Sequence, residues 1–327
     1  MFTILVTGVG SIIGYGIIGS LRRSEISTRI IGIDINSDAY GRWVSDHFIT
    51  GVRASSQDFI PLINRISEDY KIDLVIPGIE QDLFALWDNR DRIKTRVVFN
   101  SDVCIGLSRN KYETYRYLSQ FDIRLIPTLK DSSYKDCVNV LGLPFLLKPL
   151  SSSASKGIET IYNEDEFNFY TRKNAGCCIY QKIVGSPESE YTVAVFGNGA
   201  GQFFDYIILK RKLSGEGATQ KAVMTEDEDI LDYVKHLCRI LKPEGPTNIQ
   251  LRKEGSKVYL LEINARISSA CSIRTLMGYN DPEMCIKYYL INQKIKPSNK
   301  IPGKVIRYIS DNFIHQNENS NNIRHSW

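Results

Sequence analysis

The first 105 residues alternate between short apolar runs and amphipathic segments, and this alternation constrains the fold more than any other feature. Four buried strands are predicted, in the runs FTILVTG, RIIGIDIN, DLVIPGIE and RVVFN. Helices are predicted between them, from the glycine-rich GVGSIIGYG to about Arg23, in DFIPLINRISEDY after a loop around Asp46, and through Leu86. Strands joined by helical crossovers predict a doubly wound domain with a parallel sheet.

The pattern changes after two further helices, RNKYETYRYLSQF and one that ends at the corner from Gly142 to Pro144. Short strands joined by turns follow, in PFLLKPL, CCIYQKIV, YTVAVFG, QFFDYIILKRK, TNIQLRK and KVYLLEINA. The last two flank the turn at residues 254–256 and predict an antiparallel hairpin. Helices are expected at 233–241 and from about 282 to 290. The tail from about Gln316 has little to bury, so we expect it to be disordered.

Composition narrows the functional classes. The 327 residues exceed the usual size of one core and predict two or three packed units. Only 24% are charged and the net charge is +4, which argues against a nucleic-acid-binding surface. The seven cysteines form no C-x-x-C pair, which favours reduced thiols and a cytoplasmic location. No apolar run approaches the roughly 20 residues of a membrane span, so we expect a soluble, unprocessed protein without a membrane partner.

The glycine-rich start allows one functional hypothesis. Gly8, Gly10 and Gly14 follow a strand and open a helix, and Asp34 ends the next strand. Glycines at this place let phosphates reach backbone N–H groups, and the carboxylate can hold a ribose, as NAD(P)-dependent oxidoreductases require. The spacing is G-x-G-x-x-x-G, however, and tight strand-to-helix turns also use glycine for packing.

The segment VYLLEINARISS predicts a metal and phosphate site. Glu262 and Asn264 lie two residues apart on a strand, so their side chains share one face. Across the predicted hairpin, Gln250 can add a third oxygen, which gives a partial shell suited to Mg²⁺ bridged to phosphates. Arg266 continues the period of two and can hold a phosphoryl group. The alternative is a surface strand with scattered polar residues.

A lysine and a small-residue loop predict an anion site. Lys148 ends the apolar strand PFLLK, and the loop at residues 151–157 can bring backbone donors close to phosphates. The alternatives are an exposed strand end and a flexible linker. Lys111, in the first turn of its helix, would by default be a solvated lysine.

The order of these motifs resembles the ATP-grasp superfamily. After Lys148 and its loop come QKIVG (residues 181–185) and EYTV (residues 190–193), then Gln250 and the E-x-N-x-R of residues 262–266. The chain looks closest to carbamoyl-phosphate-synthase-like and D-alanine–D-alanine-ligase-like carboxylate–amine ligases, over about residues 1–310. The resemblance implies an α/β and α+β fold: a doubly wound parallel pre-grasp domain (1–108), a two-lobed ATP-grasp domain with largely antiparallel sheets, and a tail (316–327). Its small lobe would be 109–184 and its large lobe, with the metal site, 185–315.

The resemblance also implies roles for individual residues. Those that would bind ATP are Lys111, Lys148, Ser155, Lys156 and Gly157 at the phosphates, Gln181, Lys182, Ile183 and Val184 at the adenine, and Glu190 at the ribose. Gln250, Glu262 and Asn264 would bind Mg²⁺, for which Mn²⁺ can substitute. Arg211, Arg266 and Lys148 would be catalytic. Glu190 as a solvent-facing strand residue and Arg211 as part of an ordinary charged patch are the alternatives. Three departures from the family pattern are Gln181 for a glutamate, a loop with one glycine, and Gln250 for an acidic ligand.

The implied reaction joins a small-molecule carboxylate of amino-acid or sugar-acid type to an amine through an acyl phosphate, with release of ADP and phosphate. Strand ends of the doubly wound domain and the residues after Arg266 would line the acceptor pocket, with Ser11, Glu80, Asp82, Ser268 and Ser269 as candidates. Glu80 could instead cap a helix. A homodimer is compatible with this reading. Two alternatives stay open at this point, an NAD(P)-dependent oxidoreductase and a non-catalytic nucleotide-binding sensor.

Overall fold

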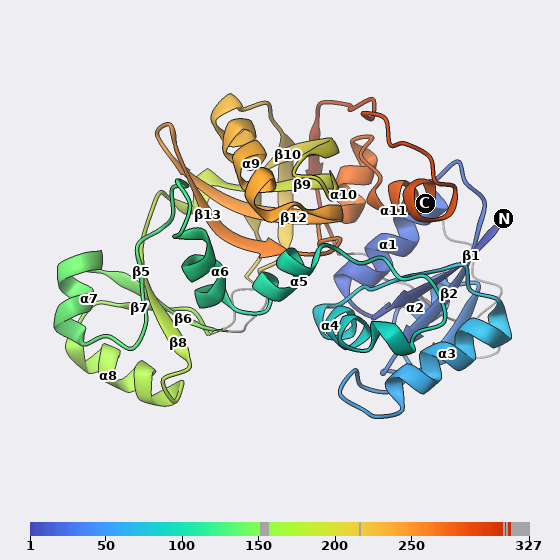
Figure 1. Cartoon of the computed structure of the whole chain (residues 1–327), viewed down its shortest axis with the longest axis horizontal. Helices are drawn as coiled ribbons and strands as arrows, with labels where there is room; N and C mark the ends of the chain where they lie inside the picture. Colours follow the sequence, from blue (N-terminus) through green and yellow to red (C-terminus); the bar gives the residue numbers. More distant parts are fainter. Residues whose placement is uncertain (151–156, 216, 310, 312, 315–327) are drawn as a thin grey trace.

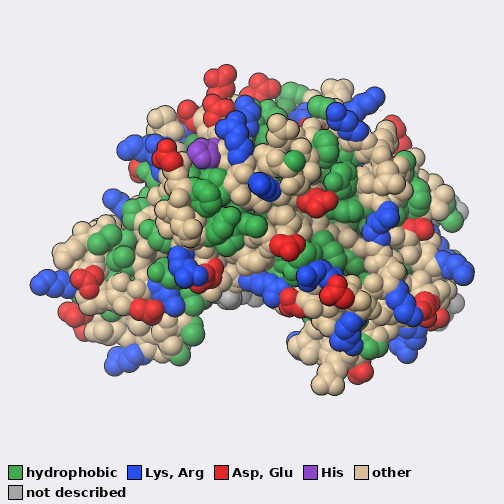
Figure 2. All heavy atoms as spheres, viewed as in Figure 1, with side chains coloured by type: hydrophobic (Ala, Val, Ile, Leu, Met, Phe, Trp, Pro, Cys, Tyr) green, Lys and Arg blue, Asp and Glu red, His purple; other side chains and the backbone are tan. Residues whose placement is uncertain are grey.

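The computed structural model describes residues 1–150, 157–215, 217–309, 311, 313 and 314, which form three sheets. A six-stranded sheet lies at the centre, with a four-stranded sheet near each end of the molecule (Figure 1). Figure 2 shows a hollow between the two ends, on the lower side of the central part. The three sheets come from residues 2–76, 128–182 and 190–306, so each falls within one of the predicted parts. The boundaries of those parts stay a prediction.

The N-terminal sheet is parallel and doubly wound, as the alternating pattern predicts. Its strands lie in the order β3 (His47–Thr50), β2 (Thr28–Asp34), β1 (Phe2–Thr7) and β4 (Leu74–Ile76). Its helices are α1 (Ile12–Arg22), α2 (Gly41–Val44), α3 (Phe59–Tyr70) and α4 (Glu80–Asp88), followed by a 3₁₀ turn, η1 (Arg90–Arg92), and α5 (Asp102–Ser108). The middle strands contain continuous buried runs, at residues 4–7 of β1 and 30–33 of β2, because helices cover both faces of the sheet.

One prediction for this region is wrong, and two short elements, α2 and β3, were not predicted. The run RVVFN does not form a full strand, because only Val97 pairs, through a single parallel bridge to Val75. The expected loop around Asp46 is short, since α2 ends two residues before it and β3 begins one residue after it. The carboxylate of Asp46 accepts a hydrogen bond from the backbone N–H of Ile30, which attaches this edge to β2. Period alone does not reveal such short elements.

The second sheet is antiparallel and belongs to the smaller end of the molecule. Its strand order is β5 (Thr128–Leu129), β8 (Cys178–Lys182), β6 (Phe145–Pro149) and β7 (Glu159–Ile161). Helices α6 (Lys111–Leu118), α7 (Tyr134–Leu141) and α8 (Glu164–Lys173) accompany it. The rings of Phe145, Phe167 and Tyr180 pack together beneath α7 and α8, with centroids 4.9–6.3 Å apart. This small core keeps β6 and β8 side by side.

The central sheet is antiparallel and contains the predicted hairpin. Its strands are β13 (Lys257–Asn264), β12 (Glu244–Glu254), β9 (Glu190–Asn198), β10 (Phe203–Leu213), β11 (Thr219–Met224) and β14 (Lys304–Ile306), in that order. The short turn η2 (Pro187–Ser189) precedes β9, and α9 (Glu228–Leu241) begins five residues before the expected Tyr233. Glu254 pairs with Lys257 across the turn, so the hairpin prediction is confirmed.

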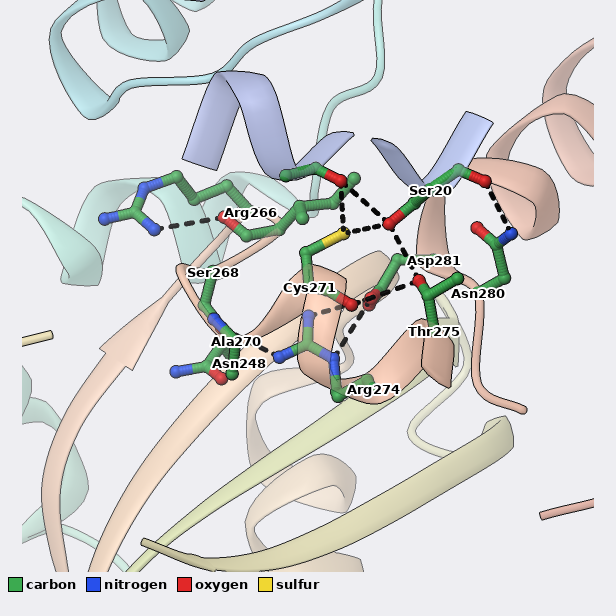
Figure 3. A network of polar contacts seen from close by, with 12 residues as sticks. Ser20, Asn248, Arg266, Ser268, Ala270, Cys271, Arg274, Thr275, Asn280 and Asp281 are labelled. Carbon is green, nitrogen blue, oxygen red and sulfur yellow. Dashed lines mark hydrogen bonds and ion pairs between the residues drawn. The ribbon is translucent and has the colours of Figure 1, made fainter. Parts of the chain in front are cut away.

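The segment after β13 packs against the first helix of the chain. Helices α10 (Cys271–Leu276) and α11 (Asp281–Cys285) contact α1, and α11 continues as the π-helix η3 (Ile286–Leu290). In Figure 3 the fully buried Arg274 and Asp281 form an ion pair of 2.8 Å, and Ser20 of α1 contacts Cys271. The expected helix from Pro282 to Leu290 is therefore present in two parts, one α-helical and one π-helical.

No described helix has the length and apolar character that a membrane span requires. The tail from Gln316, predicted to be disordered, lies outside the described residues.

Candidate functional site

A cavity of about 720 Å³ lies between the central sheet and the sheet of the smaller end. Nine of the predicted site residues line it, namely Lys111, Lys148, Gln181, Lys182, Val184, Glu190, Arg211, Gln250 and Glu262. Apolar side chains such as Leu146, Ile158 and Leu261 form other parts of its wall. Its lysine and arginine side chains outnumber its carboxylates, so the cavity favours an anionic ligand that also has an apolar part.

Lys148 is buried at the back of this cavity. Strands β6 and β8 pair so that Leu146 lies opposite Gln181, and the Lys148 Nζ donates to Gln181 Oε1 over 2.6 Å. Gln181 in turn donates from Nε2 to Thr128 Oγ1 over 2.9 Å. Burial, followed by the charges of Arg252 and Lys111, lowers the pKa of Lys148 to about 8. The ammonium is thus mostly charged at pH 7 but poorly compensated, a state that an approaching anion would stabilise.

Glu190 lies on the opposite wall between two arginines. Its Oε1 accepts from Arg211 Nη2 at 2.7 Å, and its Oε2 accepts from Arg252 Nη2 at 2.8 Å. Only 8% of the Glu190 side chain is exposed, so both ion pairs are shielded from solvent. Arg211 also donates to Gln250 Oε1 at 2.8 Å. Glu190, the residue predicted to bind the ribose, is therefore part of a buried charge network and is not an exposed strand residue.

The three oxygens predicted to bind metal lie on two neighbouring strands. Gln250 pairs with Glu262 in the register of β12 and β13, as the hairpin predicts. Each oxygen faces a cationic group: Glu262 lies 3.4 Å from the Lys111 Nζ, and Gln250 and Asn264 accept from Arg211 and Arg266. Each of the three oxygens is thus paired with a side-chain cation, which a divalent ion would have to displace in order to bind. One carboxylate and two amides would leave other positions to phosphate oxygens.

Histidine, cysteine and carboxylate clusters of metal-binding type are not found in the described ranges. A magnesium site in this part of the chain therefore depends on the amide oxygens of Gln250 and Asn264 beside Glu262. Within the same ranges, the Nδ2 of Asn264 is buried without a hydrogen-bond partner. An amide N–H group can donate to an anion but cannot bind a cation, so this atom has no bearing on the metal.

Arg266 contacts the N-terminal domain. Its Nη2 lies 2.9 Å from Glu80 Oε1 in the first turn of α4, and it also donates to Asn264 Oδ1 at 3.2 Å. Arg266 and Asn264 are not among the residues that line the 720 Å³ cavity, although both follow Glu262 directly. Arg266, the residue predicted to bind phosphate, therefore lies at the junction of the N-terminal domain and the central sheet.

Two comparisons with known proteins identify the fold and one domain. Residues 186–312 match the family model described as ATP-grasp in the biosynthetic pathway with Ter operon. The solved structure of N5-carboxyaminoimidazole synthetase from Staphylococcus aureus, complexed with ADP, superimposes with a TM-score of 0.73 at 16% identity, over 91% of this chain and 80% of that one. Residues 186–312 therefore match an ATP-grasp domain, and the chain as a whole has the ATP-grasp fold.

Other ATP-grasp proteins show the same relationship. The biotin carboxylase of Campylobacter jejuni superimposes with a TM-score of 0.68 at 16% identity, over 88% of this chain and 70% of that one. The carbamoyl phosphate synthase large chain of Methanosarcina acetivorans is 22% identical over 257 residues, which are 65% of this chain and 23% of that protein. The formate-dependent phosphoribosylglycinamide formyltransferase of Wigglesworthia glossinidia brevipalpis is 27% identical, over 63% of this chain and 54% of that protein. The chain thus spans from about a quarter to about half of these curated relatives.

The glycine-rich turn at residues 8–14 has a structural role in this fold. Gly8 has a φ of +60°, and the Gly10 N–H donates to Asp34 Oδ2 at 2.7 Å. A Cβ on Gly14 would lie 2.3 Å from the Gly8 carbonyl oxygen, so this glycine lets α1 approach β1. Asp34 thus bonds to the glycine turn itself, and the comparisons do not support the oxidoreductase alternative.

The remaining predicted ATP-grasp residues are placed as follows. Ile183 and Gly157 do not line the cavity, and Ser155 and Lys156 lie outside the described residues. Ile183 follows the last residue of β8 and is partly buried outside this cavity. Gly157 has a φ of +74°, a conformation that suits a glycine at the end of the loop.

The five acceptor candidates do not share one pocket. Ser11 caps α1 by accepting from the Gly14 N–H, and the buried Ser268 accepts from Arg274 at 2.8 Å. The backbone carbonyl of Ser269 accepts from Arg307. The sequence places all three residues near strand ends. In the structure, the hydroxyl groups of Ser11 and Ser268 and the carbonyl group of Ser269 form hydrogen bonds within the protein. Of the other two, Glu80 lies beside Arg266, and Asp82 lines a separate cavity.

That separate cavity, of about 620 Å³, lies at the carboxyl ends of the parallel strands in the pre-grasp domain. Gly8, Asp34, Arg53 and Asp82 are among its lining residues. Burial raises the pKa of Asp82 to about 6, while a hydrogen bond to Thr7 opposes this shift. A pocket at these strand ends was predicted with Asp82, whereas Arg53 was not predicted, because its loop carries no sequence motif. Arg252 was missed for the same reason, although its place two residues after Gln250 puts it on the same strand face.

Proposed function

We propose that this ATP-grasp protein is an ATP-dependent carboxylate–amine ligase. A substrate carboxylate would attack the γ-phosphate of ATP, and an amine would attack the resulting acyl phosphate to form an amide, with release of ADP and phosphate. The observation that carries the proposal is the position of Lys148 on one sheet and of Gln250 and Glu262 on another, around one cavity. This arrangement suits a nucleotide held between two lobes.

The side chains of the cavity would act mainly by positioning and by neutralising charge. Lys148 and Lys111 would hold phosphate oxygens, and Gln181, Lys182 and Val184 would surround the adenine. Gln250, Glu262 and Asn264 would hold Mg²⁺ or Mn²⁺, which supplies positive charge to the phosphates when it is bound. Because Lys111 lies 3.4 Å from Glu262, this lysine would shift from the carboxylate to a phosphate when ligands enter.

Arg266 would act where the lobes meet the pre-grasp domain. It is ion-paired with Glu80, so its guanidinium stays oriented in the absence of a substrate anion. A planar guanidinium at this position can bind two oxygens of the transferred phosphate or of the acyl phosphate. Arg211 would serve the phosphates from inside the cavity. The acceptor would enter from the pre-grasp side, beside Glu80 and Asp82.

The test is ADP release from Mg-ATP with a panel of small carboxylates and amines of amino-acid and sugar-acid type. We expect one carboxylate and one amine to release ADP and orthophosphate in equal amounts together with an amide product. Glu262→Ala and Lys148→Ala should abolish this release, while Lys257→Ala, at an exposed position of β13, should preserve it. Tight binding of Mg-ADP without release on any pair would contradict the ligase and favour a nucleotide sensor.

The substrates, the assembly and the location form the finer part of the proposal. The partners are a small-molecule carboxylate and an amine, the assembly is a homodimer and the location is cytoplasmic. One solved ATP-grasp structure with a TM-score of 0.71 is described as a domain dimer with ADP and bicarbonate, which supports a dimer here by analogy. Light scattering of the purified chain tests the dimer, and a single monomer mass would exclude it.

A further inference from the structure

The buried carboxylate of Glu190 is held by Arg252 as well as by Arg211, and none of the predicted roles includes Arg252. Arg252 lies directly opposite Glu190 in the register of β12 and β9. Its Nη2 donates to Glu190 Oε2 at 2.8 Å, and its side chain is 18% exposed. It also lines the 720 Å³ cavity. Arg252 therefore contacts both the charge network and the space that a nucleotide would enter.

The two arginines use different oxygens of Glu190. Arg211 donates to Oε1 from both Nε, at 3.2 Å, and Nη2, at 2.7 Å, whereas Arg252 donates to Oε2 alone. An ionised carboxylate offers about four acceptor positions. Oε1 is thus fully used, and the acceptor position that stays available lies on Oε2. The hydrogen bond from Arg252 orients Oε2 and thereby sets the direction of its free acceptor position.

Two further observations show that Arg252 contributes to the electrostatics of the cavity. Burial is the main cause of the lowered pKa of Lys148, and the charge of Arg252 is the next largest. In the described part of the chain, the Nε of Arg252 is buried without a hydrogen-bond partner, whereas its Nη2 donates to Glu190 beside the cavity. Arg211, by contrast, is shared between Glu190 and Gln250.

We propose that Arg252 is a positioning residue for nucleotide recognition, which orients Glu190 Oε2 to accept a ribose hydroxyl. This assignment rests on the proposed ATP site, because Glu190 reads a ribose only if a nucleotide binds there. Arg252 also keeps Glu190 paired when Arg211 turns toward a phosphate, since a buried carboxylate without a cationic partner is strongly disfavoured. The nucleotides favoured by this arrangement carry free 2′ and 3′ hydroxyl groups.

The experiment compares the binding of Mg-ADP with that of Mg-2′,3′-dideoxy-ADP to the full chain by calorimetry. The wild type should bind ADP more tightly by about tenfold to a hundredfold, the range of a hydrogen bond to a charged group. Arg252→Met should reduce this ratio to within about threefold of unity, and Arg252→Lys should give an intermediate value. Lys257→Met, at an exposed position of the partner strand, should leave the ratio unchanged. A purely structural role would weaken both ligands equally.

The outcomes separate this assignment from the proposed function. If the wild type binds neither nucleotide, the ATP site itself is wrong. If it binds both equally, or if Arg252→Met folds and keeps the wild-type ratio, ATP binding stands and the role of Arg252 is wrong. Thermal unfolding of each variant checks the fold. Should Arg252→Met not fold, Arg252→Lys decides alone, because it keeps the charge but changes the geometry, and an unchanged ratio overturns the assignment.

Discussion

The guanidinium of Arg266 lies 2.9 Å from the carboxylate of Glu80 and thereby joins the end of β13 to the first turn of α4. The side chains are 11% and 21% exposed, so this ion pair is largely shielded from solvent. It connects the strand that contains Glu262 with the helix that brings Asp82 to the 620 Å³ cavity. The proposed phosphate and acceptor regions are therefore only one ion pair apart.

Glu80→Gln tests the role of this pair. The substitution removes the charge that orients Arg266 but leaves the nucleotide cavity intact, since Glu80 does not line it. We expect kcat/KM for the acceptor to fall by about tenfold or more, in line with a loss of about 1.5–3 kcal/mol for a charged hydrogen bond, with the KM for ATP nearly unchanged. Steady-state kinetics of ADP release measures both. Asp91→Asn, at an exposed position of the 3₁₀ turn η1 that follows this helix, is the control, and an equal effect there would disprove a specific role for Glu80.

The lowered pKa of Lys148 predicts proton uptake on nucleotide binding. Between pH 8 and 9 the ammonium is partly deprotonated, because its pKa is about 8. Phosphate oxygens raise the pKa of a neighbouring lysine, so Mg-ADP binding at pH 8.5 should take up a substantial fraction of a proton and weaken as the pH rises further. Calorimetry in buffers of different ionisation enthalpy measures this uptake. Lys148→Arg keeps a charged side chain at this pH, so residue 148 should take up no proton when Mg-ADP binds. A proton uptake equal to that of the wild type would refute the assignment of the uptake to Lys148.

The raised pKa of Asp82 predicts a stability gain in Asp82→Asn. Its folded pKa of about 6 exceeds the ordinary value of 3.8, so the folded state binds the extra proton between these pH values. The ionised carboxylate therefore costs stability at pH 7, and the cost disappears as the pH falls toward 4. We expect Asp82→Asn to raise the free energy of unfolding by about 1–3 kcal/mol at pH 7 and by almost nothing near pH 4. Urea unfolding across this range checks the prediction. A gain that does not depend on pH would show that desolvation of the charge is not the cause.

The buried pair of Arg274 and Asp281 predicts a large loss in Asp281→Asn. Both side chains are about 1% exposed, and the substitution leaves the guanidinium charge without a counter-charge. The expected loss is about 3–5 kcal/mol in the free energy of unfolding, measured by urea titration. Arg274→Met combined with Asp281→Asn should cost less than the sum of the two single changes, because neither charge is then buried alone. Additive losses would mean that the two residues do not interact.

The sequence predicted nine of the residues that line the cavity, because the features that place them are local. The turn at residues 254–256 aligns Gln250 with Glu262, and both are found in that register. The period of two along β13 likewise predicted that Glu262 and Asn264 share a face. Such features depend on a few neighbouring residues, so a single sequence contains them.

Contacts between distant elements could not be predicted in the same way. The position of Arg252 opposite Glu190 depends on the register of β9 with β12, which no turn connects. The ion pair of Arg266 with Glu80 depends on how the pre-grasp domain packs against the central sheet. Ser268 was assigned to a substrate on its position alone, whereas the partner that buries it, Arg274, lies on a later helix. These relationships come from tertiary packing, for which the chain carries no local signal.

The contact of Ser20 with Cys271 spans 251 residues and has a consequence for synthesis of the chain. Helix α1 leaves the ribosome long before α10 and α11, on which its buried face packs. Until they emerge, residues such as Ile17 and Leu21 lack part of their apolar cover, and the nascent pre-grasp domain exposes a surface prone to aggregation. A chain truncated before Cys271 should therefore require a chaperone that the full-length chain no longer needs once its last helices have emerged.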